Sequence, residues 1–411
     1  MVHGGRRLEG HIDVDSAKNA ILPIIAATLL TKGKVVLHRI PKISDVDKML
    51  NIIKHMGGKV TFCEEGVVID NTSINTLTVP KELTSGIRSS IFILGAMLSM
   101  YKKAIVAYPG GCAIGLRPVG IHLFGLRELG VKIREDSDFI DCDGGSMHSN
   151  TVRLDFPSVG ATENVMMAAV LLKGDTIIQN AAKEPEIIDL ANFINTLGGK
   201  IEGAGTHTIR IQGVKRLHGG EYTPIGDRII AGTYMIAGAM TKGHIELSNA
   251  KYEDNLALID KLKKSGCNVD FFGGKIIMDM KYRPKSCSFT TGVFPGFPTD
   301  LQPQLSTMCT IAHGVSDITE NLFETRFKHF EELKKMGAKV ECFNKSALVI
   351  GVNKLYGAEV VAQDLRGGAA LVLAGLVAEG ETLINNTSYI DRGYDNIEGK
   401  LKSLGAEIKR V

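Results

Sequence analysis

One cysteine lies in a setting that suits a reactive thiol. Cys112 follows a Pro-Gly-Gly segment (109–111) and is itself followed by Gly115 and Arg117. A nearby cation lowers the pKa of a thiol and raises its thiolate fraction, while glycines on both sides make the backbone adaptable. We therefore predict that Cys112 is a reactive thiol on a loop. The other six cysteines lack this setting and are expected to be inert: Cys63, Cys142, Cys267, Cys287, Cys309 and Cys342.

Basic residues recur at equivalent places, each at the predicted start of an apolar helix: Lys18, Arg88, Arg228 and Arg366. The helix macrodipole disfavours a cation at this end, so a single case would read as a solvated surface charge. Four cases favour a different explanation, because a cation beside free helix N–H groups binds phosphate or carboxylate. The corresponding places in the other two repeats hold Asp300 with Gln302 and the segment 158–162. The pattern predicts a site for a polyanionic ligand, built from several helix starts.

The elements that must position these residues form a sixfold internal repeat. The same short pattern recurs six times: usually an apolar residue, then a glycine, a variable residue, a polar residue and a β-branched residue. Its glycines are Gly57, Gly130, Gly198, Gly266, Gly337 and Gly405, separated by 73, 68, 68, 71 and 68 residues. Each glycine follows an amphipathic run, so we predict that it ends a helix in the left-handed conformation. A second set follows longer apolar runs, which are typical of buried helices: Gly33, Gly174, Gly243, Gly314 and Gly380.

The repeat unit is therefore an apolar helix, a strand, an amphipathic helix and a further strand, which predicts an α/β protein. Its 411 residues exceed the ~250–300 at which a single core usually stops growing. We expect two domains of three units each, with the boundary in the glycine-rich stretch 218–226. The expected domains are 18–225 and 1–17 with 226–411. The second repeat has additional residues within 107–118, and a loop added to a regular scaffold commonly carries function.

Composition excludes several classes of protein. The 48 Lys and Arg against 45 Asp and Glu give a formal charge of +3, too small for a nucleic-acid-binding field. No apolar stretch approaches the ~18–20 residues that span a bilayer, and the N-terminal segment does not read as a signal peptide. Seven widely spaced cysteines favour reduced thiols in the cytoplasm. Motifs for a zinc site, a serine triad, a Walker A loop and a Rossmann fold are absent from the sequence.

The chain resembles the UDP-N-acetylglucosamine 1-carboxyvinyltransferases (MurA), the enolpyruvyl transferases of peptidoglycan synthesis. The resemblance runs nearly end to end, and its most specific parts are the loop 109–115 with 117–119 and the Phe-Pro-Thr-Asp segment 297–300. Neither is expected in the shikimate-pathway enolpyruvyl transferase, which shares the fold. Further matching segments are 16–20, 41–47, 158–162, 184–187, 364–366 and 390–394.

The resemblance implies a two-domain inside-out α/β barrel with six βαβαββ-like repeats, three per domain, and an active site in the cleft between the domains. It implies transfer of the enolpyruvyl group of phosphoenolpyruvate to the 3-hydroxyl of UDP-N-acetylglucosamine, with release of phosphate and without a metal or cofactor. Cys112 matches the proton donor that also forms a covalent adduct, and Asp300 matches the base. Lys18, Asn19, Arg117, Arg366 and Arg392 match groups that hold phosphoenolpyruvate. Nucleotide-sugar contacts are matched by Arg88, Arg117, Pro118, Val119, Gly120, Ile121, Ser158, Val159 and the Leu322 main chain. Further residues expected to bind substrate are Glu184, Asp227 and Arg228.

Alternatives remain at this stage. A regulatory paralogue that binds nucleotide sugar without turnover would be expected to have lost Cys112, Asp300 or Arg392, and all three are present. The shikimate-pathway enzyme is disfavoured by the Cys112 loop, and an RNA 3′-phosphate cyclase would need a nucleophilic histidine that the sequence does not place. Gly120 departs from the aspartate common in the family, so a contact there would use the main chain. The oligomeric state is left open between a monomer and a weak homo-oligomer.

Overall fold

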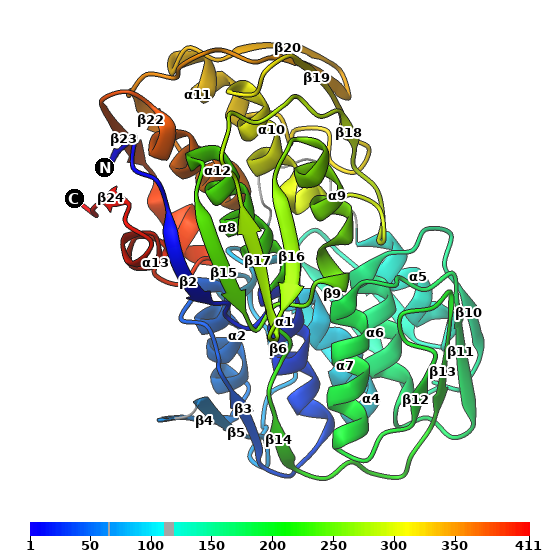
Figure 1. Ribbon diagram of the computed structural model, residues 1–411. Helices are drawn as coiled ribbons and strands as arrows, with labels where there is room; N and C mark the ends of the chain where they lie inside the picture. The colour runs from blue at the N-terminus through cyan, green and yellow to red at the C-terminus, as the bar shows by residue number, and fades with distance from the viewer. Residues whose placement is uncertain (65, 111–118) are drawn as a thin grey trace. The chain divides into compact units, whose positions relative to one another are not determined.

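The computed structural model of the chain describes every residue except 65 and 111–118 (Figure 1). The described residues divide into two compact units. The first unit contains residues 16–110 and 119–225, and the second contains residues 1–15 and 226–411. Each unit has its own continuous apolar core. Within the described residues, no helix combines the length and the apolar character that crossing a membrane requires.

The described strands of the first unit form three four-stranded sheets in the orders β14-β3-β5-β4, β6-β7-β9-β8 and β10-β11-β13-β12. In each sheet the first two strands are parallel and the other neighbours are antiparallel. The strands are β3 (Val35–His38), β4 (Lys59–Cys63), β5 (Gly66–Asp70), β6 (Thr78–Val79), β7 (Lys103–Ala107), β8 (Lys132–Glu135), β9 (Phe139–Asp143), β10 (Thr151–Arg153), β11 (Asp175–Gln179), β12 (Ile201–Glu202), β13 (Thr208–Gln212) and β14 (Gly220–Tyr222).

The helices of the first unit are of two kinds, as the sequence predicts. Three of those in the described part of the chain are buried almost all round, namely α1 (Lys18–Ala27), α4 (Ile93–Tyr101) and α6 (Val159–Ala169). The others bury one side only: α2 (Ser44–His55), α5 (Gly120–Glu128) and α7 (Pro185–Thr196). α4, α6 and α7 lie side by side in Figure 1, with β10 to β13 along their flank. Short helical turns complete the unit: η1 (Thr28–Leu30), α3 (Lys81–Thr84) and η2 (Arg88–Phe92).

The second unit repeats this plan. Its described strands form three four-stranded sheets in the orders β22-β23-β1-β24, β16-β17-β15-β2 and β18-β19-β21-β20, again with one parallel pair each. The N-terminal strands β1 (Val2–His3) and β2 (Glu9–Asp13) belong to two of these sheets. The others are β15 (His244–Ser248), β16 (Asn268–Phe272), β17 (Lys275–Asp279), β18 (Phe289–Thr290), β19 (Val315–Thr319), β20 (Lys339–Phe343), β21 (Ser346–Ile350), β22 (Glu359–Val361), β23 (Glu381–Asn385) and β24 (Glu407–Ile408).

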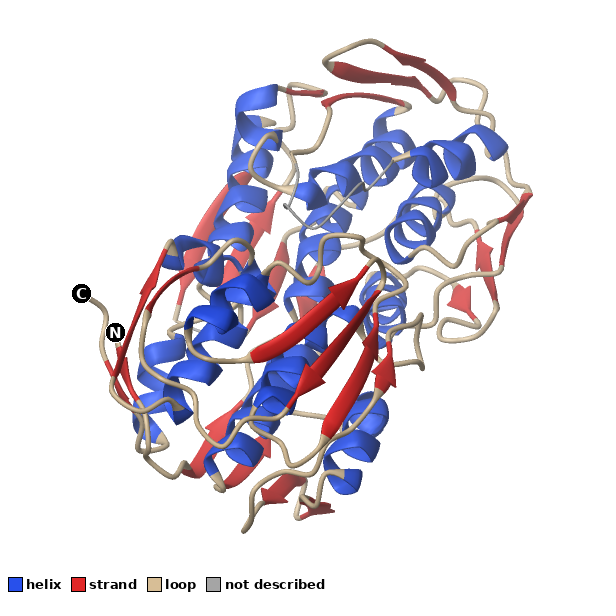
Figure 2. Cartoon of the chain, turned by 90° about the horizontal axis from the view of Figure 1, so that it is seen from above, coloured by secondary structure: helices blue, strands red, loops and turns tan. Residues whose placement is uncertain are grey.

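Buried helices again fill the centre of the second unit: α8 (Arg228–Thr241), α10 (Gln302–Thr310) and α12 (Leu365–Val377). The outer helices are α9 (Leu256–Lys264), α11 (His329–Lys335) and α13 (Ile397–Ser403), and the short turns are η3 (Glu253–Asn255), η4 (Thr299–Leu301) and η5 (Thr387–Arg392). Figure 2 shows the long helices of a unit side by side, with strands along their outer flanks. This is the expected inside-out α/β architecture, in which helices rather than sheets form the centre of each unit.

The predicted helix ends are confirmed. All six repeat glycines have a left-handed φ between 83° and 99°, and each lies two residues after the last residue of an outer helix. Only glycine adopts this conformation without a steric penalty. The glycine set by itself therefore locates the C-terminal end of every outer helix.

Candidate active site

Lys18 is the first residue of α1, as predicted, and its charge is met by a carboxylate from the next helix. Its Nζ lies 2.8 Å from Oδ2 of Asp45 in α2, and both side chains are largely buried. The N–H of Ala17, just before the helix, donates to the carbonyl of Ile225 at 2.7 Å. Asp45 explains how a cation can sit at a helix N-terminus against the macrodipole. The sequence did not single out Asp45.

The other helix starts of the first unit also hold predicted residues. Arg88 begins η2, which leads directly into α4, and its side chain is half-buried. Ser158 caps α6 by accepting a hydrogen bond from the N–H of Ala161 at 3.4 Å, with Val159 as the first helical residue. Glu184 precedes α7, whose first residue is a proline. Both features are common helix-start signals.

A residue that the sequence analysis missed links three of these elements. Asn164 in α6 is completely buried, and its Nδ2 donates to the Ile91 carbonyl at 3.1 Å and to Nδ1 of His122 at 2.8 Å. Its Oδ1 accepts from the N–H of Gly95 at 2.9 Å. Asn164 thereby fixes the start of α5, which contains Gly120 and Ile121, against α4 and α6. Its position within an apolar helix was the signal available in the sequence.

The predicted loop residues Cys112, Arg117 and Pro118 lie outside the described residues. The described chain resumes at Val119, which is buried, and Gly120 begins α5 with an exposed position.

The second unit brings Asp300 together with two buried arginines. Asp300 lies in η4, at the start of the turn that leads into α10. Its Oδ1 accepts a hydrogen bond from Arg326, and its Oδ2 accepts one from Nη2 of Arg366 at 3.1 Å. The Asp300 side chain remains 28% exposed, whereas the arginine side chains are 2% and 3% exposed. The carboxylate is therefore oriented by two cations and still reaches solvent.

Arg366 is held at the start of α12 by Asp364 and Tyr394. Asp364 caps the helix by accepting from the N–H groups of Arg366 at 2.9 Å and Gly367 at 3.0 Å. The Arg366 guanidinium lies 5.6 Å from the centre of the Tyr394 ring. Burial opposes its charge, but Asp300, Tyr394 and Asp227 raise the pKa of Arg366 above its ordinary value. Its Nε and Nη1 are buried without an acceptor among the described residues.

Arg326 was missed by the sequence analysis. Its Nε donates to the Thr299 carbonyl at 3.2 Å, and its Nη1 lies 3.9 Å from Oδ1 of Asp364. Together with its bond to Asp300, these contacts tie η4 to the cap of α12. The arginine is 26 residues from Asp300 in the chain, and the sequence offers no local pattern that would pair them.

The remaining predicted residues of the second unit also lie at element ends. Asp227 caps α8 through the N–H groups of Ile229 at 2.8 Å and Ile230 at 3.0 Å. The Arg228 guanidinium lies 5.6 Å from the centre of the Phe294 ring. Leu322 follows β19, and its N–H donates to Glu320 at 2.8 Å. Arg392 is the last residue of η5 and is half-buried.

The six described cysteines are free thiols. Burial raises the pKa of Cys142 and of Cys267 to about 12, in line with the expectation that they are inert. Cys287 differs, because a hydrogen bond from the Cys309 thiol, at an Sγ–Sγ distance of 3.9 Å, lowers its pKa to about 7. Both residues are buried, so the shift does not by itself make Cys287 accessible.

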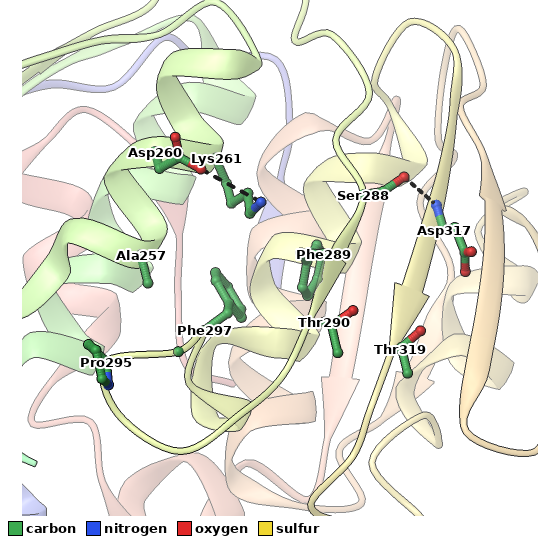
Figure 3. Close-up of a pocket in the computed structure, with 11 residues that line it drawn as sticks. Ala257, Asp260, Lys261, Ser288, Phe289, Thr290, Pro295, Phe297, Asp317 and Thr319 are labelled. Carbon is green, nitrogen blue, oxygen red and sulfur yellow. Dashed lines mark hydrogen bonds and ion pairs between the residues drawn. The ribbon is translucent and has the colours of Figure 1, made fainter. Parts of the chain in front are cut away.

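An open pocket of about 560 Å³ in the second unit lies apart from these residues (Figure 3). It is bounded by α9 and by the edge strand β18, with Phe289 and Phe297 on its floor and the Lys261 side chain beside it. None of the predicted site residues within the described part of the chain lines it. A smaller pocket of about 130 Å³ next to it is lined by Arg228 and Phe294. The larger pocket is therefore a separate feature from the predicted site residues that the structure describes.

The chain is similar over nearly its full length to known proteins. The family model for EPSP synthase (3-phosphoshikimate 1-carboxyvinyltransferase) matches residues 2–401. A protein of Caldanaerobacter subterraneus subsp. tengcongensis named UDP-N-acetylglucosamine 1-carboxyvinyltransferase 2 is 49% identical over 411 residues, covering 100% of this chain and 99% of the relative. A protein of the same name from Carboxydothermus hydrogenoformans is 46% identical over 413 residues, covering 100% and 99%.

Solved structures show the same fold. The enolpyruvyl transferase NikO from Streptomyces tendae superimposes with a TM-score of 0.88 at 24% identity, covering 99% of this chain and 97% of that one. EPSP synthase from Acinetobacter baumannii gives a TM-score of 0.73 at 18% identity, covering 100% and 99%. With full-length relatives at nearly half identity, the chain belongs to the enolpyruvyl transferase family and, within it, to the UDP-N-acetylglucosamine 1-carboxyvinyltransferases.

Proposed function

We propose that the protein transfers the enolpyruvyl group of phosphoenolpyruvate to the 3-hydroxyl of UDP-N-acetylglucosamine and releases phosphate, the first committed step of peptidoglycan synthesis. The observation that carries the proposal is Asp300, a partly exposed carboxylate held between Arg326 and Arg366. The full-length identity to relatives with this enzyme name supports it. A cytoplasmic location is part of the proposal, in keeping with the free thiols of the six described cysteines.

The reaction needs a base, an acid and a site for anions. Asp300 takes the proton of the sugar hydroxyl as its oxygen bonds to C2 of phosphoenolpyruvate, while Cys112 delivers a proton to C3. Phosphate then leaves C2 and a C3 proton returns to the Cys112 thiolate, which restores the double bond in the product. A positioned acid and base and fixed cations stabilise the charge that builds up on the way. The step requires no metal or organic cofactor.

Five of the predicted residues bind the anions in this proposal. Lys18, Asn19, Arg117, Arg366 and Arg392 hold the carboxylate and phosphate of phosphoenolpyruvate. Arg366 suits the task because its Nε and Nη1 are buried without an acceptor among the described residues, and buried donors of this kind gain most from a bound anion.

The nucleotide sugar is assigned to the other predicted residues. These are Arg88, Arg117, Pro118, Val119, Gly120, Ile121, Ser158, Val159, Glu184, Asp227, Arg228 and Leu322. Because the N–H of Leu322 already donates to Glu320, we infer that Leu322 contacts the nucleotide sugar through its carbonyl oxygen. Asp227 is engaged as a helix cap, so its contact would use the carboxylate oxygen that does not cap α8.

Phosphate release from phosphoenolpyruvate tests the proposal. The purified protein is expected to release phosphate with UDP-N-acetylglucosamine as acceptor and not with shikimate 3-phosphate. Release with shikimate 3-phosphate would assign the chain to the paralogous reaction. Binding of UDP-N-acetylglucosamine in calorimetry without any phosphate release would favour the regulatory alternative, in which the protein senses the nucleotide sugar.

A further inference from the structure

Glu320 is a buried carboxylate that the proposed chemistry does not use. It follows β19 and is 2% exposed. Its Oε1 accepts hydrogen bonds from the Leu322 N–H at 2.8 Å, the Phe323 N–H at 3.1 Å and the Thr291 hydroxyl at 2.9 Å. Its Oε2 accepts from the Thr299 hydroxyl at 2.8 Å. Two amide and two hydroxyl donors therefore surround this one side chain.

The four donors come from three separate segments of the second unit. Thr291 follows the edge strand β18, and its hydroxyl also accepts from the N–H of Asn321 at 3.0 Å. Thr299 immediately precedes Asp300 in η4. Leu322 and Phe323 form the turn after β19. The carboxylate is thus the common acceptor for the segment of the base and for the main chain assigned to the nucleotide sugar.

The donor set of the site suits a carboxylate better than an amide side chain. A carboxylate offers about four lone-pair positions and donates nothing, which matches four converging donors. A glutamine would place an NH₂ group against at least one of them. Among the described residues Glu320 has no ion pair, so its charge is stabilised by hydrogen bonds from neutral groups, which are stronger to an ion than to a neutral acceptor.

We propose that Glu320 is a positioning residue that sets the Asp300 turn in register with the Leu322 main chain. This role rests on the proposed function. The hydrogen bond from the Thr299 hydroxyl positions the base, which is the next residue in the chain. The hydrogen bonds from the Leu322 and Phe323 N–H groups position the main chain that contacts the nucleotide sugar. Arg326 supports the same turn from the other side through the Thr299 carbonyl at 3.2 Å.

Substitutions can remove the Thr299 hydrogen bond of Glu320 alone, or this bond together with those from Leu322 and Phe323. Thr299→Val removes the hydroxyl that reaches Glu320 and is expected to lower kcat about 10-fold, with the KM for UDP-N-acetylglucosamine changed no more than about 2-fold. Thr299→Ser keeps the hydroxyl and is expected to restore kcat. Glu320→Ala removes the hydrogen bonds to Thr299 and to the Leu322 and Phe323 main chain. It should therefore lower kcat and also raise the KM for UDP-N-acetylglucosamine, each about 10-fold or more. Glu341→Ala, an exposed glutamate in β20, is the matched control and should change neither.

All variants are compared below their melting temperatures, with the folded fraction measured by circular dichroism. Equal kcat for Thr299→Val and Thr299→Ser would overturn the positioning role, and so would a Glu320→Ala enzyme with the KM of the wild type. A wild type and a Glu341→Ala variant that both bind nucleotide sugar but release no phosphate would instead overturn the proposed function, and the positioning role with it.

Discussion

At the scale of single residues, Asp300 is both an ion-pair partner and the proposed base, and these roles can be separated. Asp300→Asn keeps the shape and an acceptor oxygen but cannot take a proton. We expect kcat to fall about 10²–10⁴-fold, the usual contribution of general base catalysis. The melting temperature should also fall, because buried Arg366 loses its carboxylate acceptor, whereas Arg326 retains its contacts with the Thr299 carbonyl and Asp364. The kcat is therefore compared per folded protein at a temperature below both melting transitions.

Asp270→Asn, an exposed carboxylate in β16, controls for the charge change. Turnover of Asp300→Asn within a few-fold of the wild type would leave Asp300 as a structural partner of the two arginines. A fall in turnover fully accounted for by a smaller folded fraction would also argue against a catalytic role.

Lys18 also combines two roles, and Asp45 allows them to be distinguished. Lys18→Ala leaves the buried Asp45 without its 2.8 Å partner, and breaking a buried pair typically costs about 3–5 kcal/mol. Adding Asp45→Asn removes a buried carboxylate whose ion pair with Lys48, at 4.0 Å, is longer than the one with Lys18, and it should recover much of that stability. It should not recover the use of phosphoenolpyruvate, because the cation is still missing.

The measurements are the free energy of unfolding in urea and the KM for phosphoenolpyruvate. Arg392→Ala serves as a comparison and should weaken phosphoenolpyruvate use far more than nucleotide-sugar binding in calorimetry. If the Lys18→Ala/Asp45→Asn protein regained normal phosphoenolpyruvate kinetics, Lys18 would be a structural residue only.

Residue types at helix starts could be predicted, whereas their partners could not. Lys18 and Arg366 stand out because cations are unfavourable at the beginning of an apolar helix. Asp45 and Arg326 carry no such signal, since each looks like an ordinary charge on an outer element until the fold buries it. Glu320 is similar, because its four donors come together only when β18, η4 and the turn after β19 are in place.

At the scale of elements, helix ends were predictable where glycine marks them. The six repeat glycines end the outer helices as expected. The ends of the buried helices are less uniform, because Lys102 and Lys242 take the left-handed conformation after α4 and α8. A non-glycine residue in this conformation gives no sequence signal. Tertiary packing at these ends, and not local preference, decides which residue bears the strain.

One element also carries a pH-dependent contribution to stability. His329 begins α11 and is buried, with its Nε2 2.9 Å from the Ser306 hydroxyl oxygen and its Nδ1 3.2 Å from the Arg326 carbonyl oxygen. Burial lowers the pKa of His329 to about 4, although nearby Asp364 acts in the opposite direction. The neutral ring therefore contributes fully above pH ~6.5, and its contribution is lost as the pH falls toward 4.

The expected loss is up to about 3 kcal/mol between those two pH values. Unfolding in urea should show that His329→Gln flattens this acid-side decline relative to the wild type, whereas His313→Gln, at an exposed histidine, leaves it unchanged. Parallel pH curves for the wild type and His329→Gln would show that the decline comes from carboxylates instead.

At the scale of the whole molecule, the repeat in the sequence determines most of the architecture. Each repeat contributes one buried helix, one outer helix and strands to a four-stranded sheet, and the six sheets formed by the described strands share one strand order. The sequence could not show that β1 and β2 complete sheets with strands more than 200 residues away, such as β15 and β23. Pairings at this separation leave no local pattern, because only the folded chain brings the strands together.

The central claim concerns the reaction, so the product tests it most directly. Phosphoenolpyruvate, UDP-N-acetylglucosamine and the purified protein are incubated together, and the nucleotide product is identified by mass spectrometry and carbon NMR. The account predicts one enolpyruvyl ether on the sugar 3-oxygen for each phosphate released, and no product from Asp300→Asn on the same timescale. An unmodified nucleotide sugar, or an enolpyruvyl group on a different oxygen, would contradict it.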